Sequence, residues 1–162
     1  MRILIVCTGN ICRSPMGEGL LRKMLRDRGK QGEVVVESAG TFPVEGAPAS
    51  SEAVATAAEH GVDIRGHVGR ALTDRLVQRA DLILTMAPDH RDRLVAAYPE
   101  AEEKTELITL YGDPEGDPRG VPDPIGQGKE IYERTFLQIQ RGLDAAFPKI
   151  LEGIPDERES RR

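Results

Sequence analysis

The sequence Ile-Leu-Ile-Val-Cys-Thr-Gly-Asn-Ile-Cys-Arg-Ser-Pro occupies residues 3–15 and decides the fold. Its first four residues are apolar and mostly β-branched, which is typical of a buried strand. The glycine and the asparagine allow a sharply bent backbone, and apolar residues recur at helical spacing after Ser14. Pro15 suits the first position of that helix. The order of strand, tight loop and helix predicts the first half of a βαβ unit in a parallel sheet.

The same alternation continues along the chain and predicts one α/β domain. We expect strands at 3–6, 34–37, 82–85 and 106–109, and helices after residue 14 and at about 51–60, 73–80, 88–97 and 131–147. The 162 residues suit one domain, which we place at 1–154, followed by a charged tail at 155–162 that is expected to fray. Segments 40–49 and 112–128 are rich in glycine and proline, and we interpret them as functional loops.

Composition and charge narrow the class of protein. The net charge of −5 argues against a general nucleic-acid binder and against a polybasic membrane attachment. The N-terminal apolar run is too short for a signal peptide, and no stretch approaches a membrane-spanning length. Cys7 and Cys12 are too close in sequence to staple distant parts of a secreted fold, so we expect the cytoplasm.

The loop after the first strand has the features of an anion site. Ligands bind parallel sheets at the carboxyl ends of strands, and a helix N-terminus presents unpaired N–H groups and a positive dipole end. Gly9 permits a positive φ, and Asn10 tolerates the left-handed conformation, so successive N–H groups can turn inward around a phosphate.

Three side chains in this loop predict nucleophilic phosphoryl transfer. A helix N-terminus and a nearby cation favour the thiolate form of a cysteine, which makes Cys7 the candidate nucleophile. Arg13 brings a planar fork that pairs bidentately with phosphate oxygens. Ser14 is placed to donate a hydrogen bond to the Cys7 sulfur when it leaves. The chain is therefore predicted to cleave phosphate monoesters through a phosphocysteine.

The chain resembles the low-molecular-weight protein-tyrosine phosphatases of the bacterial type. The loop matches their Cys-x-Gly-Asn-x-Cys-Arg-Ser-Pro signature, and further matches lie at residues 37–40, 66–73, 80–86 and 123–124. The resemblance implies a single-domain, four-stranded parallel sheet flanked by helices on both faces, with no metal and no cofactor. It implies that the phosphate is bound by Thr8, Gly9, Asn10, Ile11, Cys12 and Ser14. By the same analogy Ser38 and His67 support the loop and do not react.

The mechanism also needs a general acid, because a tyrosine leaving group departs as a phenolate unless it is protonated. The loop at 112–128 holds three Asp-Pro pairs, at Asp113, Asp117 and Asp123, and chemistry alone does not choose among them. The resemblance selects Asp123, because its Asp-Pro pair is the one nearest the last helix. The same carboxylate would then act as the base toward water.

Two positions bear on the substrate. Relatives that hydrolyse phosphotyrosine usually carry an aromatic residue just after the Asp-Pro pair, where this chain has Ile125. Phe42 is the candidate for an alternative wall of the pocket. A close branch of the family acts on phosphoarginine and typically has threonine where this chain has Ile11, whose apolar side chain suits an aryl group better than a guanidinium. Phosphotyrosine is therefore preferred, with phosphoarginine as the alternative.

Other readings are weaker. Arsenate reductases on this fold relay electrons through additional cysteines, which this chain lacks. A zinc site would need two more ligands near Cys7 and Cys12. A non-catalytic oxyanion or phosphopeptide binder remains as an alternative of a different class. Cys12 is either a small packing residue or the partner of a reversible disulfide that protects Cys7. We expect a phosphorylated protein as the partner, and a monomer or a weak dimer.

Overall fold

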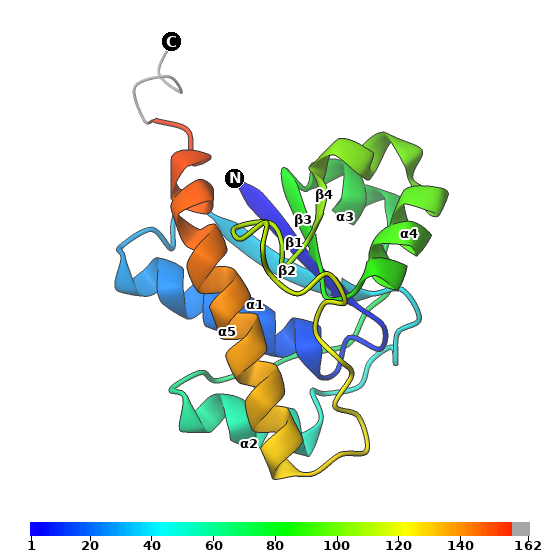
Figure 1. Ribbon diagram of the computed structural model, residues 1–162, viewed down its shortest axis with the longest axis vertical. Coiled ribbons are helices and arrows are strands. Elements are labelled where there is room, and N and C mark those ends of the chain that lie inside the picture. Colours follow the sequence, from blue (N-terminus) through cyan, green and yellow to red (C-terminus); the bar gives the residue numbers. More distant parts are fainter. Residues whose placement is uncertain (157–162) are drawn as a thin grey trace.

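The sheet is built from four parallel strands in the order β2-β1-β3-β4, as Figure 1 shows for this computed structural model. The structure describes residues 1–156. The strands are β1 (Arg2–Cys7), β2 (Val35–Gly40), β3 (Leu82–Thr85) and β4 (Thr105–Leu107). The helices are α1 (Arg13–Asp27), α2 (Ser51–Glu59), α3 (Asp74–Arg79), α4 (Pro88–Ala97), the 3₁₀ helix η1 (Pro99–Lys104) and α5 (Lys129–Glu152). The predicted α/β class and parallel sheet are confirmed.

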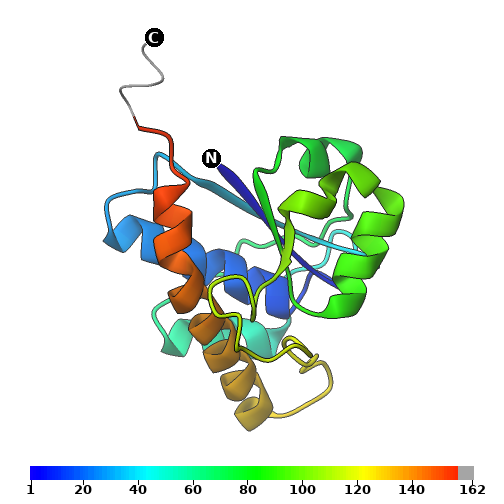
Figure 2. The same ribbon diagram turned by 45° about the horizontal axis from the view of Figure 1, so that its top comes forward.

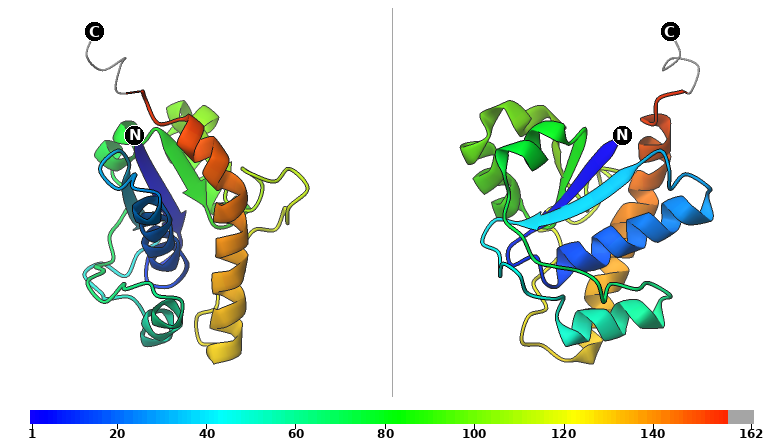
Figure 3. Two further views of the ribbon diagram at one scale, coloured as in Figure 1. Left: turned by 90° about the vertical axis from the view of Figure 1, so that its left-hand side faces the viewer. Right: turned by 180° about the vertical axis from the view of Figure 1, so that it is seen from behind.

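Alternate residues of β1 face opposite layers, because successive side chains of a strand point to opposite faces. Ile3 and Ile5 pack in the larger core cluster with α1, α2 and α5. Leu4 and Val6 pack in a smaller cluster with α3, α4 and η1. Both faces of the sheet are therefore covered, as the two views of Figure 3 show. A strand buried on both faces reads as a continuous apolar run, which explains the sequence at 3–6.

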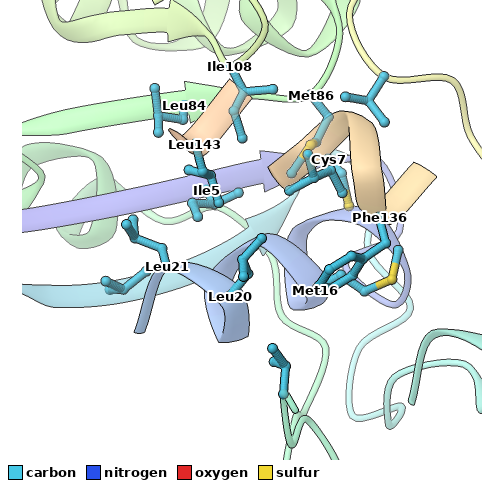
Figure 4. Packing of buried hydrophobic residues seen from close by; sticks show 14 of the residues in the cluster. Ile5, Cys7, Met16, Leu20, Leu21, Leu84, Met86, Ile108, Phe136 and Leu143 are labelled. Atoms are coloured by element: carbon cyan, nitrogen blue, oxygen red, sulfur yellow. The ribbon is translucent and has the colours of Figure 1, made fainter. Parts of the chain in front are cut away.

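The larger core reaches the end of β1, where the predicted nucleophile lies. Figure 4 shows Cys7 beside Met86, which directly follows β3, and near Phe136 from α5. Cys7 is buried among these apolar groups at 2% exposure. The loop that follows β1 therefore starts from a rigidly packed strand end.

Several boundaries differ from the sequence-based expectation. Helix α1 begins at Arg13, with Cys12 as its N-cap, so Pro15 occupies the third helical position and not the first. Strand β2 begins one residue later than expected and extends to Gly40, because its small residues pair with the end of β1. A Cβ on Gly40 would lie 2.3 Å from the Thr8 carbonyl oxygen, so this glycine lets the loop approach the strand.

Of the later elements, α5 extends beyond its expected bounds of 131–147 at both ends. Strand β3 and helix α4 have the expected bounds, while β4 is shifted by one residue toward the N-terminus and ends at Leu107. The 3₁₀ helix η1 was not anticipated. Within residues 1–156, no helix combines the length and apolar character needed to cross a membrane. Of the charged tail, residues 157–162 lie outside the described part of the chain, and its predicted fraying stays a prediction.

Candidate active site

The loop at residues 8–12 lies at the carboxyl end of β1 and leads directly into α1. Asn10 has a φ of 59° and is the only residue other than glycine with positive φ among those described. The sequence names Gly9 and Asn10 as the residues that allow positive φ, and of the two Asn10 adopts it while Gly9 does not. Asparagine tolerates the left-handed conformation because its short polar side chain bonds locally.

Asn10 is held by hydrogen bonds on both its side chain and its backbone. Its Nδ2 donates to Ser14 Oγ at 2.8 Å and to Ser38 Oγ at 3.0 Å. Its Oδ1 accepts from the Arg70 backbone N–H at 3.0 Å. The Nε2 of His67 donates to the Asn10 carbonyl oxygen at 2.6 Å, which fixes the proton on that ring nitrogen. The structure thus brings Ser38 and His67 to the loop, and it adds Arg70, which the sequence did not single out.

The Cys7 sulfur lies 2.8 Å from Ser14 Oγ. Ser14 is fully buried, and its oxygen already accepts a hydrogen bond from Asn10. Its hydroxyl proton is therefore available for the sulfur, which makes serine the donor in the contact with Cys7.

The Arg13 guanidinium is buried beneath the same loop, at 5% exposure. Its Nη1 donates to the Val121 carbonyl oxygen at 2.8 Å, and its Nη2 donates to Thr8 Oγ1 at 3.3 Å. The Nη2 also lies 3.6 Å from Asp123 Oδ2. Arg13 therefore joins the loop after β1 to the loop before α5, which Figure 2 shows in yellow running from the end of β4 to the start of α5.

The three Asp-Pro pairs have different surroundings. Asp123 faces Arg13, and its Oδ1 accepts a hydrogen bond from the Ile125 backbone N–H at 3.1 Å. Asp117 pairs with Arg119, and hydrogen bonds from that arginine hold the pKa of the carboxyl below its usual value. Asp113 caps the turn at Glu115. Of the three, Asp123 is the one that lies against the buried guanidinium.

Cys12 lies behind the loop in a small polar cluster. Its sulfur is within hydrogen-bond distance of Tyr132 OH at 3.2 Å and of Ser50 Oγ at 3.4 Å. Burial raises the pKa of the Cys12 thiol above its ordinary value, and burial together with Cys12 also raises the pKa of Tyr132. Both groups are therefore neutral at pH 7, which sets Cys12 apart from a nucleophile.

His90 in the first turn of α4 also reaches the loop, and sequence reasoning missed it. Its Nε2 lies 2.8 Å from Thr8 Oγ1, and its Nδ1 accepts from the Ala87 backbone N–H at 3.0 Å. Burial first, and the charge of Arg13 second, lower the pKa of His90 to about 4. A signal was present, because a helix that follows a parallel strand starts at the same edge of the sheet as the site.

Apolar side chains border the loop. Phe42 is 75% exposed and Ile125 is 50% exposed. Ile11 is half-buried and packs on the edge of the larger core. Val44, another exposed residue, donates its backbone N–H to the Gly9 carbonyl oxygen at 3.0 Å. No group of three or more histidine, cysteine, aspartate or glutamate side chains within residues 1–156 is arranged to hold a metal ion.

Comparison with known proteins places this geometry among phosphatases. The family profile described as low molecular weight phosphotyrosine protein phosphatase matches residues 2–155. The Escherichia coli K12 low molecular weight protein-tyrosine-phosphatase Etp is 40% identical over 139 residues, 86% of this chain and 87% of that protein. The structure of a low molecular weight protein tyrosine phosphatase from T. tengcongensis is 41% identical with a TM-score of 0.84, covering 92% of this chain and 99% of that one.

An arginine phosphatase is similar as well. A YwlE arginine phosphatase mutant with a phosphorylated active-site serine is 31% identical with a TM-score of 0.86. The likeness covers 98% of this chain and 99% of that one.

Proposed function

This chain belongs to the low molecular weight phosphotyrosine protein phosphatase family, and from this membership we propose that it hydrolyses phosphotyrosine in proteins through a phosphocysteine on Cys7. The observation that carries the proposal is the position of Arg13. Its guanidinium lies beneath the loop that bears Cys7 and also faces Asp123. The groups that we assign to binding, attack and proton transfer therefore lie on two segments that Arg13 connects.

In the first step, the Cys7 thiolate attacks the phosphorus atom and the ester P–O bond breaks. Arg13 and the N–H groups of the loop bind the phosphoryl oxygens, where charge must be stabilised. The Asp123 carboxyl gives its proton to the departing phenolic oxygen, so tyrosine leaves as a neutral phenol. The products of this step are a phosphocysteine and the Asp123 carboxylate.

In the second step, water attacks the phosphorus atom of the phosphocysteine. The Asp123 carboxylate takes a proton from that water, and the P–S bond breaks. The hydroxyl of Ser14 donates to the sulfur that leaves, which is consistent with the 2.8 Å contact between the two atoms. Inorganic phosphate is released, and the Cys7 thiolate is ready for another cycle. The phosphorylated serine named for the YwlE mutant supports a phosphorylated side chain in this reaction.

The preference for an aryl phosphate rests on apolar side chains at the rim. Ile11, Phe42 and Ile125 offer apolar surface and no carboxylate for a guanidinium. Hydrolysis of phosphotyrosine peptide, phosphoarginine and p-nitrophenyl phosphate should be compared without added metal for wild type, Cys7→Ser and Asp123→Ala. Wild type is expected to prefer the tyrosine peptide, and Cys7→Ser to lose turnover. Preference for phosphoarginine would support the alternative substrate. Phosphate binding without hydrolysis would indicate that the protein is a non-catalytic oxyanion-binding module.

The setting of the enzyme belongs to the same proposal. Phosphorylated proteins are its partners, and we place it in the cytoplasm as a monomer or a weak dimer that binds neither nucleic acid nor membranes. The net charge of −5 and the two unbridged cysteines support this setting. Light scattering across a concentration series tests the oligomeric state, and a tight dimer would contradict it.

A further inference from the structure

His90 lies outside the loop at residues 8–12, yet it is one of the most deeply buried polar residues near it, at 1% exposure. The Ala87 backbone N–H donates to its Nδ1 at 3.0 Å. A neutral imidazole has one donor and one acceptor nitrogen, so this contact places the ring proton on Nε2. The tautomer of His90 is thus set by the first turn of its own helix, α4.

The Nε2–H of His90 points at Thr8 Oγ1, 2.8 Å away. The same oxygen receives a second donor, Nη2 of Arg13, at 3.3 Å. A hydroxyl oxygen has two lone pairs, and both are then engaged. Thr8 therefore bridges a neutral imidazole and a buried guanidinium, and the bridge connects the start of α4 to the start of α1.

The charges around His90 keep the ring neutral. Arg13 faces it from α1, and Arg93 lies on its own helix, and both disfavour a second positive charge. Asp123 faces it from the long loop and Asp89 from its own helix, and both favour the charged form, but burial outweighs them. Because the ring stays neutral, Nδ1 remains an acceptor for the helix and Nε2 remains a donor for Thr8.

The Arg13 guanidinium is consequently fixed at both terminal nitrogens. Val121 accepts from Nη1 and Thr8 accepts from Nη2, while Asp123 Oδ2 lies 3.6 Å from Nη2. Without an oriented acceptor at Thr8, the fork is free to turn toward the Asp123 carboxylate. We propose that His90 is a positioning residue, which orients the Thr8 hydroxyl and through it holds the Arg13 guanidinium in the plane that receives a phosphoryl group. This inference rests on the phosphatase function proposed above.

Two substitutions of His90 separate its two contacts. His90→Asn keeps an acceptor near the Nδ1 position and so keeps the helix cap, but it cannot reach Thr8. His90→Gln places an amide nitrogen near the Nε2 position and keeps the donor to Thr8, but it lacks the cap acceptor. The probe is inorganic phosphate as a competitive inhibitor of p-nitrophenyl phosphate hydrolysis, with KM and kcat measured separately.

We expect His90→Asn to raise KM and the phosphate inhibition constant about three- to tenfold, the size of one lost hydrogen bond, with a smaller change in kcat. His90→Gln should retain tighter phosphate binding than His90→Asn. Thr8→Val should weaken phosphate binding by a similar factor, and adding His90→Asn to it should weaken binding no further. His60→Asn is the control, because His60 stacks on Phe136 and pairs with Glu133 away from the loop.

Unchanged phosphate binding in His90→Asn would overturn the proposal. So would losses that multiply in the double variant, or a loss in His90→Gln as large as in His90→Asn, which would show that the donor to Thr8 does not account for the effect. Should His90→Asn fail to fold, the other two variants decide the matter: Thr8→Val must weaken phosphate binding and His90→Gln must leave it close to that of wild type. A wild-type protein that binds phosphate without hydrolysing the ester would refute the phosphatase function, and direct titration of the same variants with inorganic phosphate would then test the role of His90.

Discussion

Arg13 Nη1 donates a hydrogen bond to the Val121 carbonyl oxygen at 2.8 Å, and this contact fixes the segment that bears Asp123. The Val121 backbone N–H in turn donates to the Met86 carbonyl oxygen at 2.7 Å, just beyond β3. Val121 is thereby pinned between the sheet and the guanidinium, two residues before the carboxylate. Arg13 and the segment that bears Asp123, the proposed phosphate-binding residue and general acid, are thus parts of one hydrogen-bonded unit, so a change in either should disturb both.

Replacing Arg13 with lysine should lower kcat/KM for p-nitrophenyl phosphate about 10²-fold or more. A lysine ammonium lacks the planar fork, so it cannot bind phosphate bidentately while also holding Val121. Each hydrogen bond to a charged group contributes about 1.5–3 kcal/mol, and 1.4 kcal/mol corresponds to a factor of about ten.

Arg119→Lys is the matched control for Arg13→Lys. Its side chain is 88% exposed and pairs only with Asp117 on the same loop. Activity in this control should stay within about twofold of wild type, since exposed ion pairs contribute little. Equal losses in the two variants would show that the buried fork has no special role.

Gly120→Ala should damage both stability and turnover. Gly120 has a φ of 79°, and a Cβ there would lie 2.2 Å from the Met86 carbonyl oxygen. The backbone must shift to relieve this contact, and this shift should displace Val121 and Asp123, which come shortly after Gly120 in the chain. We expect kcat to fall at least about tenfold, because general acid catalysis contributes about 10²–10⁴-fold and depends on placement.

Gly29→Ala controls for the backbone strain of that substitution. Gly29 also has positive φ, 68°, but nothing lies within 4 Å of a Cβ built on it. This variant should lose about 1–2 kcal/mol of unfolding free energy from left-handed strain and keep its kcat. Urea unfolding and initial rates measure the two effects. Retention of kcat in Gly120→Ala would contradict the inference that the hydrogen bonds of Val121 position Asp123.

The sequence predicts the site best where the residues of the site are close together in the chain. The run at residues 3–15 contains the strand, the bent loop and the helix, and it identifies Cys7, Arg13 and Ser14 as neighbours. The sequence leaves open which of Gly9 and Asn10 takes the positive φ, because that depends on the groups that bind the loop. Asn10 takes the positive φ, held by Ser38, His67 and Arg70 from distant segments.

Contacts between segments that are distant in the chain could not be predicted from the sequence. Nothing in the residues around Val121 indicates that its carbonyl oxygen meets Arg13, since any backbone oxygen is an equal acceptor. His90 reads as one polar residue on a short helix, and its burial depends on how α4 packs against β3. The start of α1 also differs from the expectation, since the helix begins at Arg13 with Cys12 as its N-cap.

Stability should depend on pH through His90. The pKa of His90 is lowered to about 4 by burial, against about 6.5 in an unfolded chain. Between these values the unfolded state binds more protons than the folded state, so the free energy of unfolding rises with pH. The contribution is complete above pH 6.5 and is lost progressively as the pH falls toward 4.

The difference between wild type and His90→Asn isolates this contribution, since both proteins share every other titrating group. Urea unfolding at pH 7, 6, 5 and 4.5 should show the stability advantage of wild type shrinking as the pH is lowered. An advantage that stays constant across the series would mean that His90 does not remain neutral in the folded state over this range.

Mild peroxide should convert Cys7 and Cys12 into a disulfide that inactivates the enzyme reversibly. The Cys7 thiolate attacks hydrogen peroxide, the O–O bond breaks, and a sulfenic acid forms together with hydroxide, which takes a proton to become water. The Cys12 thiol, five residues away in the same curled loop, then attacks that sulfur, the S–S bond forms and a second water leaves. Cys12 is held as a thiol by burial beside Tyr132 and Ser50, so this second step should need its proton to be released locally.

Mass spectrometry of peptides after graded peroxide treatment measures this outcome, with activity followed before and after addition of dithiothreitol. Cys12→Ser should lose activity irreversibly at the same peroxide dose, because its Cys7 would proceed to sulfinic acid. Tyr132→Phe removes one hydrogen-bond partner of the Cys12 sulfur and should change the rate of bridge formation without preventing it. If wild-type Cys7 reaches sulfinic acid without any bridge, Cys12 serves only to pack the base of the loop.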